Sequence, residues 1–120
     1  MKKKVIIVMN ISNVMEVASW RNYADAILLA WQGGQEGGNS ITDILCGAVN
    51  PSGKLTASFP MTYRDVPSYN NFPGTPKDAS NPEYSLYEEG IYLGYRYYNT
   101  FGIRPAYEFG YGLSYSHFAY

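Results

Sequence analysis

The sequence predicts an α/β fold: a mostly parallel sheet followed by an extended tyrosine-rich arm. Two short apolar runs, near residues 5–10 and 26–31, suit strands that are covered on both faces. A glycine loop follows the second run and leads into a short amphipathic segment. Residues 84–120 contain ten of the thirteen tyrosines, so the end of the chain differs in composition from its beginning.

The first strand is predicted from Val5-Ile6-Ile7-Val8-Met9, which follows three lysines. Lysines before an apolar run are also typical of an export signal. This run of five is shorter than the roughly 7 to 15 residues of a signal peptide, and no small-residue cleavage site follows it. We therefore expect a buried strand and no signal peptide in this chain.

A helix is predicted near residues 39–46, after the second strand stops at Gly33-Gly34. Ser40, with Asp43 three residues later, is a variant of the capping box. Gly47 stands where a helix commonly ends on a left-handed residue. The pattern thus predicts strand, glycine loop and helix in succession.

A third strand is predicted near residues 55–59, where Leu55, Ala57 and Phe59 alternate with polar neighbours. Before it, residues 50–53 read Asn-Pro-Ser-Gly, which favours a type I turn. The turn and the strand would complete a β-α-β unit.

The glycine loop, residues 33–40, has the spacing of a phosphate-binding loop but lacks its lysine. Asn39 stands at that position, and Glu36 adds a negative charge where an anion would bind. The dinucleotide fingerprint G-x-G-x-x-G is also absent. We expect close backbone packing here, and no cofactor.

Composition excludes several partner classes. The net charge is −1 and charged residues make up 16%, so no basic field favours nucleic acid or an anionic membrane surface. No stretch approaches the roughly 20 apolar residues of a membrane helix. Cys46 is the only cysteine, which excludes an internal disulfide, and we expect it to be a small buried residue.

The expected organisation is an α/β core portion at 1–62, a long loop at 63–84 and the tyrosine-rich arm at 85–120. Proline, asparagine and glycine interrupt every periodic pattern between residues 61 and 84. A connection of that length is usually functional or ordered by a neighbouring domain.

The tyrosines of the arm allow two interpretations. Their rings could stack on sugars, or they could pack structurally with their hydroxyls paired or solvated. On an extended strand Tyr95, Tyr97 and Phe101 would share one face, and Arg96 and Tyr98 the other. A two-sided pattern favours packing over a single stacking platform.

Candidates for chemistry are few. His117 is the only histidine, which excludes a histidine-rich metal site, and we expect it at the surface. Glu88 and Glu89 are adjacent and would point to opposite faces of a strand, while Glu36 would cap or orient the glycine loop. Ordinary structural roles are expected for Asp25 and Asp43. The sequence predicts no catalytic residue and no metal ligand, and it assigns no substrate-binding residue.

Two segments carry a resemblance to a known family. GQEGGNSITDILCGAVNPSGKLTASFP resembles the signature in the C-terminal α/β sandwich domain of family 3 glycoside hydrolases, the β-glucosidase type. Residues 87–98 and 107–115 are similar to that family's EGIYxGYRYY and FGYGLSY segments, in the same order and at a similar spacing. Thr56, where the family often has proline, and Ile41-Thr42 at the helix start are small departures.

The resemblance implies the C-terminal part of a retaining β-glycosidase that hydrolyses O-glycosidic bonds, with a carbohydrate substrate in the intact enzyme. The family's nucleophile is an Asp on an N-terminal (β/α)8 barrel, and its acid/base is usually a Glu upstream of the strand that resembles residues 5–10. Both would precede Met1, so this piece is expected to be inactive alone. Intact relatives are often periplasmic or secreted, and a fibronectin-like domain often follows.

Two expectations follow from that implication. This chain would complete a partial α/β sandwich, and without the barrel and the remaining strands it would expose apolar surface and self-associate. The rival interpretation is a non-catalytic carbohydrate-binding or scaffold module that works alone.

Overall fold

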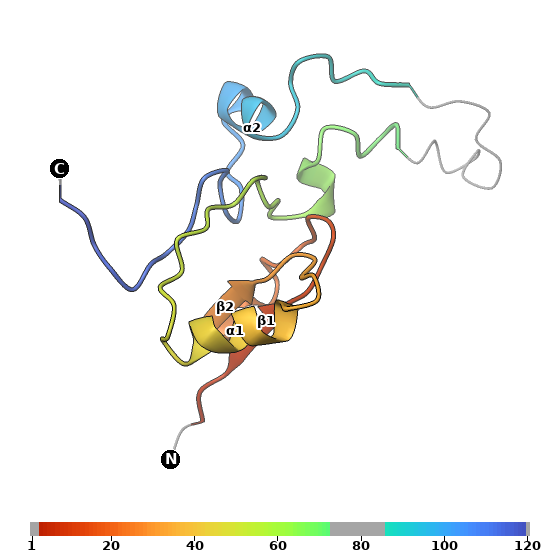
Figure 1. Ribbon diagram of the computed structural model, residues 1–120. Coiled ribbons are helices and arrows are strands. Elements are labelled where there is room, and N and C mark those ends of the chain that lie inside the picture. The colour runs from red at the N-terminus through yellow and green to blue at the C-terminus, as the bar shows by residue number, and fades with distance from the viewer. Residues whose placement is uncertain (1–2, 73–85, 120) are drawn as a thin grey trace.

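The computed structural model describes residues 3–72 and 86–119 and shows a mixed α/β chain (Figure 1). Two strands, two α-helices and two 3-10 helices occur in the described part: β1 (Ile6–Met9), η1 (Arg21–Tyr23), β2 (Ala26–Leu29), α1 (Gly37–Leu45), η2 (Tyr63–Asp65) and α2 (Tyr95–Phe101). Residues 73–84 of the expected loop and residue 85 of the expected arm lie outside the described residues.

The first two predicted strands are confirmed, and they pair in parallel. Register runs from Ile6 opposite Ala26 to Met9 opposite Leu29. Because parallel strands cannot be joined by a tight turn, the chain crosses over through residues 10–25, which include η1. Within the described residues each strand has only one neighbour, so both are edge strands.

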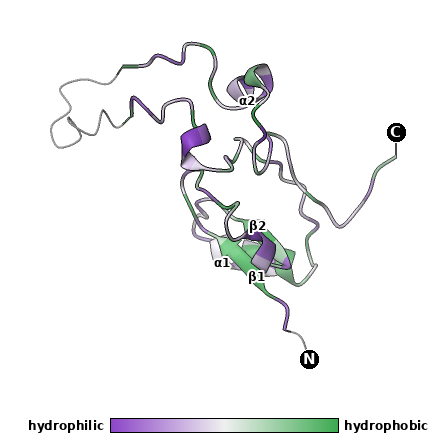
Figure 2. Cartoon of the chain, turned by 180° about the vertical axis from the view of Figure 1, so that it is seen from behind, coloured by the Kyte–Doolittle hydropathy of each residue, from purple (hydrophilic) through white to green (hydrophobic). Residues whose placement is uncertain are grey.

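Only one face of β1 is covered. Ile7 and Met9 point into the core, whereas Ile6 is 53% and Val8 38% exposed. Figure 2 shows both strands in the hydrophobic colour. We expected strands covered on both faces. Among the described residues, β1 is covered on one face only.

The core joins three distant parts of the chain. Met9 of β1 and Val17 of the crossover meet Phe59 from the middle of the chain and Ala106 from near its end. The Phe59 ring lies 6.2 Å from Trp31, at the end of β2, and 6.5 Å from Tyr107, measured between ring centroids. Aromatic pairs at this spacing attract one another beyond their buried area.

The predicted third strand near residues 55–59 is wrong. This segment forms a single antiparallel bridge, between Phe59 and Tyr107, and does not join the β1–β2 sheet. Its backbone bonds are widely spaced: Leu55 N donates to Tyr111 O and Phe59 N to Tyr107 O, both at 2.8 Å. The alternation of Leu55, Ala57 and Phe59 correctly predicted a packed face. The backbone of this segment, however, pairs with the returning arm and not with the β1–β2 sheet. The type I turn expected at residues 50–53 is not formed either.

Helix α1 is confirmed, but it begins two residues earlier than expected. It starts at Gly37, so Ser40 lies inside it and donates from Oγ to the Glu36 carbonyl at 3.0 Å. The capping box expected at Ser40 and Asp43 is therefore wrong. Gly47 follows the helix with a φ of +80°, which confirms the predicted left-handed residue.

A capping box does occur at residues 62–65, within the segment whose sequence shows no periodic pattern. Thr62 accepts a bond from the backbone of Asp65, and the Asp65 side chain accepts one from the Thr62 backbone N–H at 2.8 Å. Together they begin η2, which turns the chain after Pro60.

The strand expected at residues 95–98 is also wrong, because α2 occupies this stretch. Tyr97 and Phe101 lie four residues apart and their ring centroids are 5.2 Å from each other, as neighbours on a helix face. Tyr98 points inward and is buried. Gly102 ends the helix with a φ of +64°. Tyrosine favours strands only where a sheet surface receives it, and none is present here.

The arrangement is open for its length. The Cα radius of gyration is 17.6 Å, against roughly 14 Å for a compact domain of 120 residues.

Replacing Gly47 with Ala should destabilise the chain by about 1–2 kcal/mol, because a Cβ is strained at positive φ even where space is free. Gly53 is the matched control: a Cβ there also meets nothing, and its φ is not positive. Gly53→Ala should change stability by less than about 0.5 kcal/mol. Urea unfolding measures both, and equal losses would contradict the left-handed cap.

Candidate functional site

The two segments that carry the resemblance lie against each other, and Asn50 joins them. Its Oδ1 accepts from Ser114 Oγ and from Tyr115 N, both at 2.9 Å. Its Nδ2 donates to Ser116 Oγ at 3.0 Å. The sequence placed Asn50 in a turn, and no local signal indicated a partner more than sixty residues away.

Further contacts continue this junction between the segment after α1 and the end of the arm, whose backbones are traced in Figure 1. Tyr115 donates from its hydroxyl to the Ile44 carbonyl at 2.9 Å, and Lys54 Nζ donates to the Gly112 carbonyl. A Cβ on Gly112 would stand 2.6 Å from the Gly53 oxygen, so only glycine fits. The end of the arm thus packs on the segment that follows α1.

Arg21 anchors the start of the same returning segment. Its Nη1 donates to the Ala106 carbonyl, and its guanidinium lies 5.1 Å from the centroid of the Tyr107 ring. A cation over an aromatic face is attracted to it, so η1 is held to a residue 85 positions later.

Close backbone packing, expected throughout the glycine loop, is found at Gly33 only, since a Cβ on any of the other three glycines would meet nothing within 4 Å. Trp31 precedes it with a φ of 50°, a rare conformation for a bulky residue. A Cβ on Gly33 would stand 3.0 Å from the Gly37 Cα, which explains the need for a small residue. Glu36 Oε2 accepts from Asn39 Nδ2 at 2.6 Å, so the residue in the lysine position is held by a carboxylate. Glu36 orients the loop through Asn39 and does not bond the helix backbone.

Asp25 has the structural role that the sequence assigned to it. It accepts from Val5 N and from Lys4 Nζ, both at 2.9 Å, and fixes the start of the sheet. The Val5 N–H first, and the Lys4 ammonium second, lower the pKa of its carboxyl. Asp43 is exposed, and its carboxylate makes no hydrogen bond among the described residues.

The remaining titratable residues are not brought together. Glu88 is exposed and Glu89 half-buried, but they lie in an irregular segment and not on a strand. His117 is exposed, as expected. Cys46 is also exposed, so its predicted burial is wrong: it lies just past α1, on a side that no other described segment covers.

The described residues contain neither a cluster of metal ligands nor a membrane-spanning helix. In residues 3–72 and 86–119 no three His, Cys, Asp or Glu side chains gather so that they could hold a metal ion. None of the helices in that part of the chain is long and apolar enough to cross a membrane.

The aromatic side chains around α2 pack mainly on one another. Phe101 lies 5.3 Å from Tyr92 and 5.2 Å from Tyr97, and Tyr97 lies 5.7 Å from Tyr98, between ring centroids. Burial, followed by the negative charge of Asp65, raises the pKa of Tyr98 to about 12. Rings tilted against each other do not form a flat platform, which supports the packing interpretation.

Comparison with known proteins identifies the family. Residues 1–95 match the family model described as glycosyl hydrolase family 3 C-terminal domain. The chain belongs to glycoside hydrolase family 3. Its α/β fold accordingly corresponds to part of the α/β sandwich domain of that family.

Among curated relatives, β-glucosidase B of Emericella nidulans is 42% identical over 120 residues, which cover 95% of this chain and 14% of the relative. An exo-α-(1→6)-L-arabinopyranosidase of Bifidobacterium longum is 42% identical over 116 residues, which cover 97% of this chain and again 14% of the relative. The chain therefore spans about one seventh of the length of these relatives.

Solved structures agree. β-Glucosidase 3B of Thermotoga neapolitana, in complex with α-D-glucose, superposes with a TM-score of 0.85 at 61% identity, over 94% of this chain and 15% of that one. A β-glucosidase of Kluyveromyces marxianus in complex with glucose superposes with a TM-score of 0.81 at 39% identity, over 93% of this chain and 13% of that one.

Asn50→Ala should release the end of the arm and cost about 1.5–4.5 kcal/mol, since three hydrogen bonds are lost and each contributes roughly 0.5–1.5 kcal/mol. Asn50→Asp is the matched control, because it keeps the acceptor for Ser114 and Tyr115 and loses only the donor to Ser116. Amide exchange should speed up at residues 113–119 in Asn50→Ala much more than in Asn50→Asp. Unchanged amide exchange in both variants would contradict the role of Asn50 in holding residues 114–116.

Asp25→Asn should lower the Tm near neutral pH. A carboxyl whose pKa is lower in the folded than in the unfolded chain stabilises the fold above the unfolded pKa, and this contribution disappears as pH falls through the folded value. The Tm difference between wild type and variant should therefore shrink below about pH 4. Asp43→Asn, which removes an exposed carboxylate that bonds no described residue, is the control for the loss of one charge. A pH-independent difference for Asp25→Asn would refute the assignment.

Proposed function

We propose that this chain forms the C-terminal part of the α/β sandwich in a retaining β-glycosidase of the β-glucosidase type. In this proposal the sandwich and barrel of the whole enzyme supply the nucleophile and the acid/base, and this piece carries neither. Residues 1–62 contribute to the sandwich core, and residues 85–120 lead toward a following fibronectin-like domain.

The open sheet is the observation that carries the proposal. β1 and β2 are both edge strands among the described residues, and β1 leaves Ile6 and Val8 exposed on its outer face. Strands of parallel sheets are normally covered on both faces. A sheet of this kind fits one layer of a larger sandwich.

The side-chain contacts support the inactive role. Retaining hydrolysis needs two carboxyl groups held roughly 5 Å apart, one as nucleophile and one as acid and then base. Glu36 is bonded to Asn39, and Asp25 to Lys4 and Val5. Both carboxylates serve the local structure.

The chain alone should not hydrolyse an aryl β-glucoside above the uncatalysed rate, but it should restore activity to a partner that lacks this piece. The partner is Thermotoga neapolitana β-glucosidase 3B, to which the chain is 61% identical, shortened by the matching segment. The two are refolded together, and release of the aryl group is followed.

Glu36→Gln should restore activity as well as the wild type, because Glu36 takes no part in the chemistry. Val8→Lys should restore much less, because a charge would stand on the face that the partner covers. Turnover by the purified chain alone that disappears in Glu36→Gln would sink the proposal, and so would complementation that is indifferent to Val8→Lys.

We further propose that the chain alone self-associates through β1. Unpaired strand edges with apolar faces promote pairing between chains. Light scattering after size exclusion should show dimers or larger species, and Val8→Lys should shift them toward the monomer. Tyr23→Lys, which alters a side chain 82% exposed on η1, is the control and should not.

The alternative is a self-sufficient carbohydrate-binding or scaffold module, favoured by the exposed aromatic rings around α2. A sharply monomeric wild type with uniform amide protection over residues 3–72 and 86–119 would support this alternative over the enzyme piece.

A further inference from the structure

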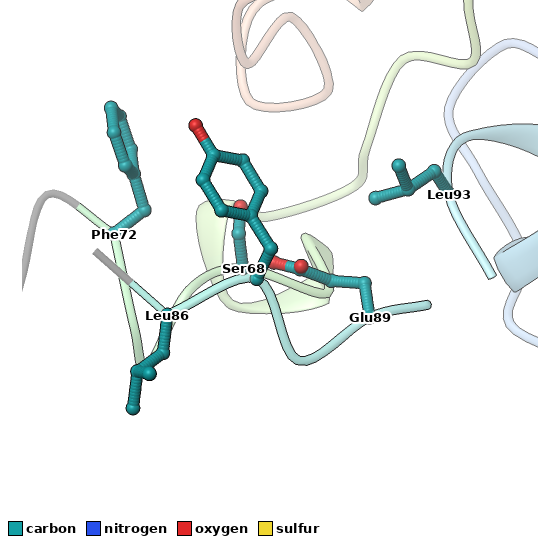
Figure 3. Close-up of a pocket in the computed structure, with 6 residues that line it drawn as sticks. Ser68, Phe72, Leu86, Glu89 and Leu93 are labelled. Atoms are coloured by element: carbon teal, nitrogen blue, oxygen red, sulfur yellow. The ribbon is translucent and has the colours of Figure 1, made fainter. Parts of the chain in front are cut away.

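A hollow of about 270 Å³ lies between the segment after η2 and the segment before α2 (Figure 3). The hollow is lined by Ser68, Phe72, Leu86, Tyr87, Glu89 and Leu93. It is somewhat smaller than the roughly 300–1,000 Å³ of pockets for drug-sized ligands, which suits a single small ring.

Three hydrogen bonds lie beside the hollow, and two of them, both from Asn71, join its two sides. Asn71 Nδ2 donates to the Leu86 carbonyl at 2.8 Å, and it lies 3.4 Å from Glu89 Oε1. Tyr63 donates from its hydroxyl to the Phe72 carbonyl at 3.3 Å. The segments on the two sides are thus tied together by side chains, which pre-organises the hollow for a ligand.

Four of the lining residues are apolar or aromatic, and the other two, Ser68 and Glu89, are polar. Rings of Phe72 and Tyr87 are 54% and 84% exposed, so their faces are free to receive a ligand. In Figure 3 the Glu89 side chain extends toward Ser68, and Leu93 points toward them from the other side. A ligand that fits must offer both an apolar face and hydrogen-bonding groups.

The polar groups here are mainly acceptors that need donors. The Glu89 carboxylate forms no ion pair with any described residue and accepts one hydrogen bond, from Asn71 Nδ2 at 3.4 Å, which leaves further acceptor positions on its two oxygens. Buried acceptors are normally satisfied by a protein group, a water or a ligand. A neutral ligand rich in hydroxyl groups supplies such donors.

We propose that this hollow binds one pyranose ring of a carbohydrate without hydrolysing it. The C–H face of the sugar packs on the rings of Phe72 and Tyr87, and its hydroxyls donate to the Glu89 carboxylate. Ser68 offers a hydroxyl that can donate or accept. This inference goes beyond the proposed enzyme role, because it concerns binding that is measured without turnover.

A cation is the main rival ligand, since aromatic rings and a carboxylate also attract ammonium groups. Cation–π attraction is weak where the rings face water, and the Tyr87 ring is almost fully exposed. The open walls therefore favour the sugar over the cation.

Methyl β-D-glucopyranoside is titrated into the ¹⁵N-labelled full chain, and backbone amide shifts are followed. Shifts should saturate in the millimolar range and cluster at residues 68–72 and 86–93. Tyr87→Ala and Glu89→Gln should each weaken binding about fivefold or more. Tyr23→Ala removes an equally exposed tyrosine elsewhere and should leave the affinity unchanged.

Three results would overturn the proposal: no saturable shift up to about 100 mM sugar, shifts that cluster elsewhere, or equal weakening by Tyr23→Ala. Erythritol, which has hydroxyls but no ring, should not bind, and tetramethylammonium should bind less tightly than the sugar. Should a variant unfold, the wild-type shift map alone decides. Complementation of the shortened enzyme is scored separately, so failure of this site leaves that result readable.

Discussion

The pairing of Phe59 with Tyr107 is the contact on which the rest of this structure depends. Phe59 donates its N–H to the Tyr107 carbonyl and accepts from the Ala106 N–H, both at 2.8 Å. Its ring packs against Trp31 at the end of β2, while Arg21 reaches Ala106 from the crossover. One residue pair thus joins the sheet, the middle of the chain and the arm, although about fifty residues separate its members. Without this pairing, Phe59 would no longer be held over the covered face of β1.

Phe59 and Ala106 cover one face of β1 only, so the core of the described residues lies on one side of that strand. Met9 faces Phe59 and Ala106, whereas Ile6 and Val8 point away from them. Apolar burial stabilises by roughly 25 cal/mol per Å², so a strand that leaves Ile6 and Val8 exposed gains less than one covered on both faces. The open face of β1 accords with the Cα radius of gyration of 17.6 Å, which exceeds that of a compact domain of this length.

Sequence reasoning succeeded where structure is decided locally. The two parallel strands follow from apolar runs, and Gly47 from the place where a helix must stop. It failed where distant contacts decide. Leu55 and Phe59 alternate like a strand, but their partner lies fifty residues away and runs antiparallel. At the candidate site, the role of Glu36 could be predicted from the sequence. The hydrogen bonds of Asn50 could not, because the partners of Asn50 lie far along the chain, at residues 114–116.

Packing contacts explain much of the distinctive composition of these segments. Gly112 is small because the Gly53 oxygen approaches it, and Asn50 holds Ser114 and Tyr115 in place. These are constraints of packing, which any enzyme built on the same sandwich must meet whatever sugar it cleaves. Relatives named for a glucoside and for an α-(1→6)-L-arabinopyranoside accordingly match this stretch at the same 42% identity. Equal identity to relatives named for different sugars is what we expect of a stretch that is constrained by packing. A sugar-binding hollow in this piece would, on the same argument, recognise a pyranose face in general.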